Sequence, residues 1–215
     1  NQIKEIIDRR VRGESLGRIL GYRDFWKSRF YLSADTLEPR PDTETLIEEV
    51  LHDHKSPKSI LDLGTGTGCI LLSLLQEFPE AVGTAVDKAQ GACEAATDNA
   101  TRLGLENRTT VLNGSWFDPL PQDSKFDLIV SNPPYIPSAE IRNLQSEVKN
   151  HDPILALDGG NDGLDPYKFL CSNLKKYLEP DGIVVLEFGA GQEHDIARIV
   201  RDAGATLIRI TNDLS

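Results

Sequence analysis

Methionine is absent from this 215-residue chain, even from its first position. We therefore expect the chain to be a fragment of a longer one. Cysteine is scarce, and the three cysteines stand far apart without forming a C-x-x-C pair. This spacing argues against a disulfide framework and favours a reducing compartment. The cysteines are Cys69, Cys93 and Cys171.

Long apolar runs and an excess of positive charge are also lacking. No apolar run approaches the roughly 20 residues that a helix needs to span a bilayer, and the first residues do not form a signal peptide. The net charge of −11 opposes nonspecific attraction to nucleic-acid backbones or anionic membranes. We therefore predict a cytoplasmic monomer with no direct nucleic-acid or membrane partner; a mitochondrial protein is the alternative location.

Several familiar site patterns are missing as well. A phosphate-binding P-loop would need Gly-Lys-Ser/Thr, which does not occur, and no serine stands in a Ser/His/Asp pattern typical of a hydrolase. His52 and His54 are two residues apart, unlike metal ligands at i and i+4, while His151 and His194 stand alone. The sequence therefore predicts no metal site.

What the sequence does contain is a regular alternation of apolar strands and amphipathic helices from residue 58 onward. We predict strands at residues 59–63, 81–86, 108–112, 126–130, 182–188 and 206–210, and helices at residues 69–78, 91–103, 165–178 and 192–203. This order is typical of an α/β fold with a doubly wound, mostly parallel sheet. Before it we predict a helix over 1–13, a hairpin within 21–38 and a helix over 42–54, capped by Asp42 or Thr43.

A glycine-rich turn follows the first strand of this series. It reads Gly64-Thr65-Gly66-Thr67-Gly68 and runs directly into a predicted helix. Glycine permits a positive φ and a close approach of a ligand, and the N-terminus of the helix would lie beside that ligand. A dinucleotide fingerprint needs G-x-G-x-x-G, whereas here the third glycine comes one position early. The turn suits S-adenosylmethionine (SAM) better, since SAM has no pyrophosphate; a purely structural turn is the alternative.

Two side chains that follow the next strands suit the nucleoside part of such a ligand. Asp87 closes the second strand, 19 residues after Gly68, where a carboxylate can accept both ribose hydroxyls. Its alternative role is to cap the following helix. Trp116 follows the third strand and can cover an adenine ring with its apolar face, although a core tryptophan is an equally good interpretation.

The most informative stretch is Asn132-Pro133-Pro134-Tyr135, directly after the apolar strand at 126–130. The two prolines end the strand, and Asn132 is pushed toward an extended shape because it precedes a proline. The Asn132 oxygen and the Pro133 carbonyl can then each accept one N–H of a planar amino group, while Tyr135 stacks on that group. Open α/β sheets place their ligands at this end of the strands.

This arrangement suits methylation of an amide nitrogen. Such a nitrogen is a weak nucleophile, but the methyl of SAM is very reactive, so alignment matters more than a strong base. We therefore predict catalytic and substrate-binding roles for Asn132, Pro133 and Tyr135.

The segment Glu38-Pro39-Arg40-Pro41-Asp42-Thr43-Glu44 is open to two interpretations. It is either a rigid linker with a helix cap, or a lid over the cofactor whose geometry Arg40 and Glu44 fix. The loop over residues 136–163 is long for a compact domain, which is typical of a functional loop.

Taken together, these motifs resemble the HemK/PrmC family of protein-(glutamine-N5) methyltransferases. The resemblance covers nearly the whole chain and includes, besides the stretches above, Arg9-Arg10-x-x-Gly13-Glu14, Ile19-Leu20-Gly21 and Ala156-Leu157-Asp158-Gly159-Gly160. It implies a Rossmann-like SAM-dependent methyltransferase fold and, as substrate, the glutamine of the Gly-Gly-Gln loop of peptide chain release factors. It also implies SAM contacts with Gly64 to Gly68, Asp87, Trp116 and Asn132, and S-adenosyl-L-homocysteine as product. The glutamine itself would be held by Asn132, Pro133, Pro134 and Tyr135.

The resemblance further implies a division of the chain into three parts. Residues 1–20 would be the end of an N-terminal helical substrate-binding domain, residues 21–41 a hairpin and linker, and residues 42–215 the catalytic domain. Three alternatives stay open: a glutamine methyltransferase of a large-subunit ribosomal protein, an adenine N6-methyltransferase of nucleic acid, and an inert SAM-binding module. The acidic charge opposes the nucleic-acid enzyme, and intact Asn132 and Asp87 oppose the inert module.

Overall fold

The computed structural model describes residues 2–52 and 56–213, and its centre is a five-stranded parallel sheet. The strand order is β5-β4-β3-β6-β7. The strands are β3 (Ser59–Leu63), β4 (Val82–Asp87), β5 (Thr109–Asn113), β6 (Phe126–Ser131) and β7 (Leu178–Leu186). The order reverses direction between β3 and β6, and that reversal marks the place where a doubly wound sheet binds its ligand.

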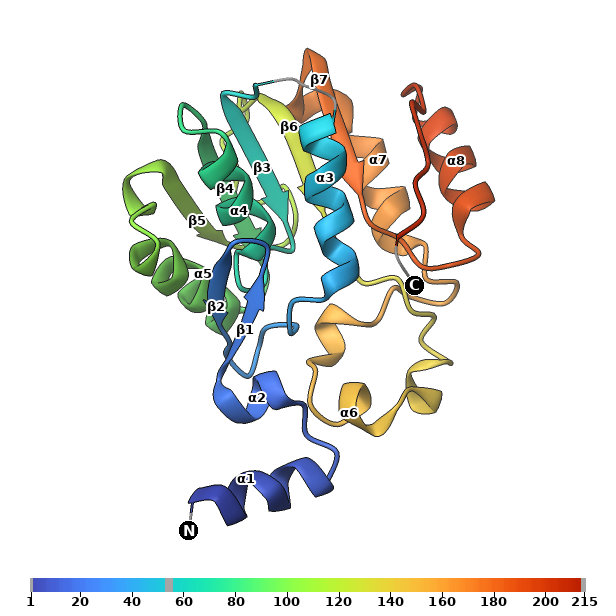
Figure 1. Cartoon of the computed structure of the whole chain (residues 1–215). Coiled ribbons are helices and arrows are strands. Elements are labelled where there is room, and N and C mark those ends of the chain that lie inside the picture. Colours follow the sequence, from blue (N-terminus) through green and yellow to red (C-terminus); the bar gives the residue numbers. More distant parts are fainter. Residues whose placement is uncertain (1, 53–55, 214–215) are drawn as a thin grey trace.

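Both faces of the sheet are buried, which explains why the strands read as continuous apolar runs. Along β3, Ile60 packs into one core with α3 and α4, whereas Leu61 packs into a second core with α7. Figure 1 shows α3 and α4 on the face turned to the viewer. The helices are α3 (Glu44–His52), α4 (Cys69–Glu77), α5 (Gln90–Arg102), α7 (Asp165–Tyr177) and α8 (Glu193–Asp202). The predicted α/β fold with a doubly wound parallel sheet is confirmed.

The first part of the chain forms small elements that lie near the ligand end of the sheet (Figure 1). These are α1 (Gln2–Val11), α2 (Leu16–Leu20), and the antiparallel pair β1 (Tyr22–Phe25) and β2 (Ser28–Tyr31). Phe25 and Phe30 of the hairpin are buried in the core with α3 and α4. The predicted N-terminal helix and hairpin are confirmed, while the division of the chain at residues 20 and 41 stays a prediction.

The long loop after β6 is folded into short helical turns. It contains η3 (Ile141–Asn143), α6 (Ser146–Lys149) and η4 (Ile154–Ala156). Two further single turns occur elsewhere, η1 (Pro41–Thr43) and η2 (Glu106–Arg108). Asp152 ties this loop to the N-terminal segment, because its two oxygens accept bonds from Arg18 Nη2 at 2.9 Å and Arg40 Nη2 at 2.6 Å. The Asp152 side chain is only 3% exposed, so its carboxylate is shielded from solvent, whereas the Arg40 side chain stays 35% exposed.

Two predictions about element boundaries need correction or restriction. Residues 206–210 form no strand: they are extended but unpaired, and Ile208 is 69% exposed. Their apolar and β-branched side chains suit a strand, but no neighbouring strand within the described residues bonds to them. The helix predicted over 42–54 begins after η1, at Glu44, and its last two predicted residues lie outside the described part of the chain. Among the helices of residues 2–52 and 56–213, none has the length and apolarity to cross a bilayer.

Candidate active site

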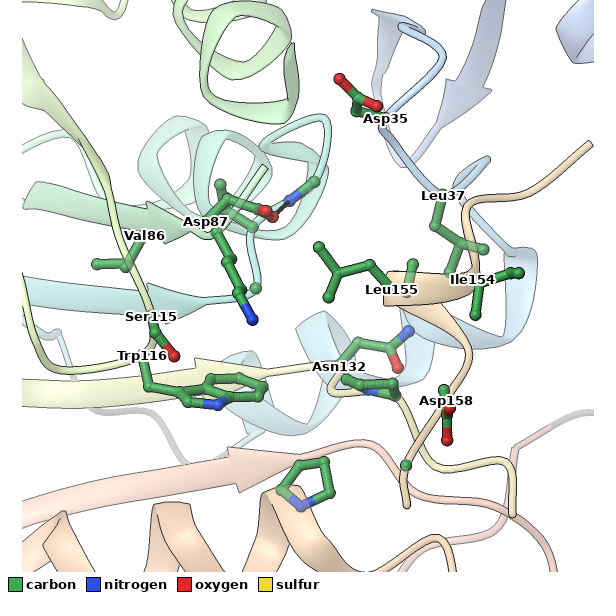
Figure 2. Close-up of a pocket in the computed structure, with 18 of the residues that line it drawn as sticks. Asp35, Leu37, Val86, Asp87, Ser115, Trp116, Asn132, Ile154, Leu155 and Asp158 are labelled. Atoms are coloured by element: carbon green, nitrogen blue, oxygen red, sulfur yellow. Dashed lines mark hydrogen bonds between the residues drawn. The ribbon is translucent and has the colours of Figure 1, made fainter. Parts of the chain in front are cut away.

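A cavity of about 950 Å³ opens at the carboxyl ends of β3, β4 and β6. Figure 2 shows Asp87, Trp116 and Asn132 around the same hollow, with Leu155 of the long loop projecting toward them and Ile154 on the other side of that loop, near Leu37. The sheet thus supplies one wall of the cavity, and the tied-down loop supplies another. This placement brings together the residues that the sequence predicted from separate strand ends.

The glycine turn has the backbone geometry that only glycine adopts easily. Gly64, Gly66 and Gly68 have φ values of 74°, 56° and 79°, a region that costs other residues free energy. Gly64 and Gly66 line the cavity together with Thr65 and Thr67. Gly68 instead faces inward: a Cβ there would lie 3.1 Å from Leu72 Cδ1, so its role is to allow α4 to pack closely.

Asp62, at the end of β3, stabilises this turn through a hydrogen bond with the Thr65 side chain. It is fully buried, and its Oδ2 accepts a 2.6 Å bond from the Thr65 hydroxyl, whereas Oδ1 has no well-aligned partner within the described residues. Burial raises the pKa of Asp62 to about 7, with the nearby Asp87 charge adding to the rise. No separate role for Asp62 was expected from the sequence, although an acid at the end of a buried strand is itself unusual.

Asp87 lies at the tip of β4 and points into the cavity (Figure 2). Its Oδ2 accepts a 2.9 Å bond from the Gly66 amide, and its Oδ1 accepts a 2.9 Å bond from the Ala89 amide. Burial raises its pKa above the ordinary value, while these amide bonds oppose the rise. Each oxygen keeps a further lone pair, so the carboxylate can both brace the turn and accept hydroxyl groups of a ligand. The predicted ribose contact stays a prediction.

Trp116 takes part in both the core and the cavity. It has a φ of 50°, uncommon for a residue with a side chain, and it follows β5. Its ring lines the cavity near Gly64 and also packs against the core on the α7 face. The two interpretations that the sequence left open are therefore compatible, because the residue both lines the cavity and packs against the core.

Asn132 is anchored on the nitrogen side of its carboxamide. Its Nδ2 donates a 3.1 Å bond to Thr43 Oγ1, and the residue lines the cavity (Figure 2). With Nδ2 turned to Thr43, Oδ1 is the polar atom of the side chain that remains for a ligand. Thr43 is 3% exposed, and the only role predicted for it from the sequence was that of a helix cap.

The other residues of the tetrapeptide are placed differently. Pro134 lines the cavity, whereas Pro133 is buried and is not among the described residues that line it. Tyr135 also lies outside that lining; its ring packs with Tyr167, and its carbonyl accepts a 3.1 Å bond from Gln192 Nε2. Burial raises the pKa of Tyr135 to about 12. The substrate contacts expected of Pro133 and Tyr135 stay predictions.

The segment before α3 contributes to the cavity, as one of its two interpretations requires. Arg40 lines the cavity and is bonded to Asp152, so the lid interpretation gains a physical connection to the loop. Glu44 has a different task, because its Oε1 accepts a 2.8 Å bond from the Trp26 amide in the hairpin.

One charged residue beside Asn132, Glu187, was not expected from the sequence. Glu187 follows β7, and its amide donates a 3.0 Å bond to the Ser131 carbonyl, so it stands level with the end of β6. Only the pairing of β6 with β7 reveals this neighbour. The sequence signal that could have pointed to Glu187 is a carboxylate at the end of an apolar strand.

No group of three His, Cys, Asp or Glu side chains within residues 2–52 and 56–213 is arranged to hold a metal ion.

The cavity fits SAM in shape and chemistry. It is large enough for a nucleoside with an amino-acid arm, and it combines an aromatic face, a glycine turn and a carboxylate acceptor. The acidic side chains Asp35 and Asp87 on its lining also favour a cationic ligand over a phosphorylated one.

Comparison with known proteins supports this assignment. Residues 36–150 match the family described as "Methyltransferase small domain". The release factor glutamine methyltransferase of Rhodospirillum rubrum is 49% identical over 99% of this chain and 65% of its own length. The enzyme of the same name from Bradyrhizobium diazoefficiens is 45% identical over 97% of this chain and 71% of its own length. The chain therefore spans roughly two thirds of the length of these relatives.

Among solved structures, the hMettl16 catalytic domain in complex with a MAT2A 3′UTR hairpin has a TM-score of 0.62. It is 18% identical and covers 79% of this chain and 66% of that one, so it shows the shared fold alone. The match over residues 36–150 and the two relatives confirm the resemblance seen in the sequence. The chain therefore belongs to the release factor glutamine methyltransferase family.

Proposed function

We propose that this protein methylates the side-chain amide nitrogen, N5, of the glutamine in the Gly-Gly-Gln motif of peptide chain release factors. The observation that carries the proposal is the placement of Asn132. Its Nδ2 is held by Thr43 at 3.1 Å, and the residue lines the same cavity as Asp87 and the glycine turn. A fixed amide acceptor beside a nucleoside site is what the methylation of an amide requires.

SAM, when bound, supplies an electrophilic methyl group on a sulfonium. The role of Asn132 is to accept one N–H of the substrate amide at Oδ1, which fixes the direction of the nitrogen and favours loss of a proton to solvent. The Pro133 carbonyl is proposed as acceptor of the second N–H. Such alignment can supply a large part of a rate enhancement, because the reacting atoms need no further search.

The chain's own residues also give the mouth of the cavity an apolar rim. Ile154 and Leu155 line the cavity although they are 61% and 50% exposed, so apolar side chains stand at its mouth. We propose that an extended loop of the release factor covers them when it enters. The protein would act in the cytoplasm as a monomer, and the negative net charge favours a protein substrate over nucleic acid.

The test offers tritiated SAM to the protein with purified release factor, with large-subunit ribosomal protein and with DNA. We expect label only on the release factor, at the glutamine of its Gly-Gly-Gln motif. Label confined to the ribosomal protein or to DNA would reject the proposed substrate, and no label together with normal SAM binding would favour an inert module. Since the chain spans only part of its relatives, a full-length relative serves as the positive control.

Asn132→Ala tests the role of the amide. We expect turnover to fall by at least about 100-fold, because the alignment of the substrate nitrogen is lost, while calorimetry shows SAM binding largely preserved. A collapse of SAM affinity with unchanged turnover at saturation would instead assign Asn132 to the cofactor.

A further inference from the structure

Glu187 lies beside Asn132, and the proposed reaction does not yet use it. Its amide bonds to the Ser131 carbonyl at 3.0 Å, and its own carbonyl accepts a 2.8 Å bond from the Tyr167 hydroxyl. The backbone of Glu187 is therefore fixed on both sides, at the end of β7 nearest to Asn132. Its side chain therefore starts from a backbone position held level with the end of β6.

The carboxylate of Glu187 lies against the two side chains that hold the site together. The Thr43 hydroxyl and the Asn132 amide are near enough to lower its pKa by hydrogen bonding, whereas burial, the larger effect, raises that pKa. Oε2 is nevertheless without a well-aligned hydrogen-bond partner among the described residues. The carboxylate is thus close to both groups and retains unused acceptor capacity.

The chemistry of these three groups fixes the direction of their hydrogen bonds. An ionised carboxylate only accepts, a hydroxyl both donates and accepts, and a carboxamide donates from nitrogen and accepts at oxygen. Thr43 alone cannot select an orientation of Asn132, because its hydroxyl could equally donate to Oδ1. Once the Thr43 hydroxyl donates to Glu187, its oxygen can only accept, and Nδ2 of Asn132 must face it.

We propose that Glu187 is a positioning residue that acts through the Thr43 hydroxyl to turn Oδ1 of Asn132, rather than Nδ2, toward the substrate amide. This inference rests on the proposed function, because it concerns the acceptor that would hold that amide. A flipped carboxamide would present two donors to the N–H groups of the substrate, and two donors cannot bond to each other.

Protonation of Glu187 removes this constraint on the hydrogen-bond directions. A neutral carboxyl group can donate to Thr43, and the Thr43 hydroxyl is then free to donate to Oδ1 of Asn132. Activity should therefore be retained while Glu187 is ionised and should fall as the pH drops through its pKa, which lies above the ordinary range for Glu. The other titratable groups that interact with Glu187 in the described residues are Asp42, Asp213, Tyr135, Tyr167 and Cys69.

Enzyme kinetics test the effect on the reaction. Glu187→Gln keeps the shape of the side chain but can donate to Thr43, so we expect kcat to fall by about 10- to 100-fold with SAM affinity preserved. Thr43→Val should act in the same direction, and Thr43→Ser, which keeps the hydroxyl, should retain most activity. Glu106→Gln removes the same charge from an exposed position before β5 and is the matched control. The acid limb of the kcat profile should disappear in Glu187→Gln.

A second measurement does not depend on methylation. In protein labelled with ¹⁵N-asparagine, the Asn132 side-chain amide signals, assigned with Asn132→Ser, should shift as Glu187 titrates and should lose this titration in Glu187→Gln. If the proposed substrate is wrong, this result still stands and supports the orientation by Glu187. Amide signals that do not titrate with Glu187, or a Glu187→Gln enzyme with the wild-type pH profile and kcat, would overturn the inference.

Discussion

Asp62 should make the protein less stable as the pH rises toward neutrality. The side chain is fully buried at the end of β3, and burial raises its pKa from 3.8 to about 7. The folded protein therefore keeps a proton on Asp62 over a pH range in which the unfolded chain has lost it. Because the unfolded state binds fewer protons there, the free energy of unfolding falls with rising pH.

The size of the effect follows from the shift. Each pH unit between the two pKa values costs about 1.4 kcal/mol per proton, so the total loss is about 4 kcal/mol for the whole interval. Between about pH 5 and pH 7 the loss should be about 2 kcal/mol, and above about pH 8 the curve should level off. The effect lies on top of the titration of all other groups, so it must be measured as a difference.

Asp62→Asn provides that difference. The amide oxygen can still accept the bond from the Thr65 hydroxyl, but the variant no longer titrates at this position. We expect urea unfolding at several pH values to show the wild type losing about 2 kcal/mol relative to the variant between about pH 5 and pH 7. Two curves that run parallel over this range would show that Asp62 is ionised throughout, and the argument from burial would be wrong.

Three further perturbations address the glycine turn, the cofactor and the loop. Asp87→Ala should weaken SAM binding by about 1–3 kcal/mol in calorimetry, since charge-assisted bonds are lost; unchanged affinity would place the ribose contact elsewhere. Gly68→Ala should destabilise the protein by about 2 kcal/mol or more, against about 1 kcal/mol for Gly66→Ala, whose added Cβ meets no atom within 4 Å; equal thermal shifts would contradict the packing role. Asp152→Asn should lower the free energy of unfolding by about 3 kcal/mol, because the buried partner of two arginines loses its charge. Proteases should then cut residues 136–163 faster; the same resistance as in the wild type would show that Asp152 does not hold this loop in place.

The strands of the sheet could be predicted because their apolar runs are local. Residues 126–130 and 59–63 are buried on both faces, and such runs have few other stable placements. The prediction failed at residues 206–210, which contain similar apolar and β-branched side chains but have no bonded partner strand among the described residues. Whether an extended segment joins a sheet depends on its neighbours, which the segment itself does not encode.

The candidate site divides in the same way. Asp87 and Asn132 could be predicted because each follows its own strand directly, and parallel strands end at one edge of the sheet. Thr43 and Glu187 could not, since they reach Asn132 only through contacts between residues distant in the sequence. The inward orientation of Gly68 likewise depends on α4 and α5 packing beneath the turn.

The pairing of β6 with β7 has a consequence for how this protein can vary. Phe126 pairs with Leu178, yet Leu128 pairs with Ile183, so β7 bulges near the end of the sheet opposite to the cavity. From Leu128 to Ser131 the pairing is continuous. Insertions and deletions in the bulge can therefore be absorbed there without sliding the carboxyl end of β7. Asn132 and Glu187, which follow the paired ends of β6 and β7, would therefore keep their relative position when the chain length changes at the start of β7.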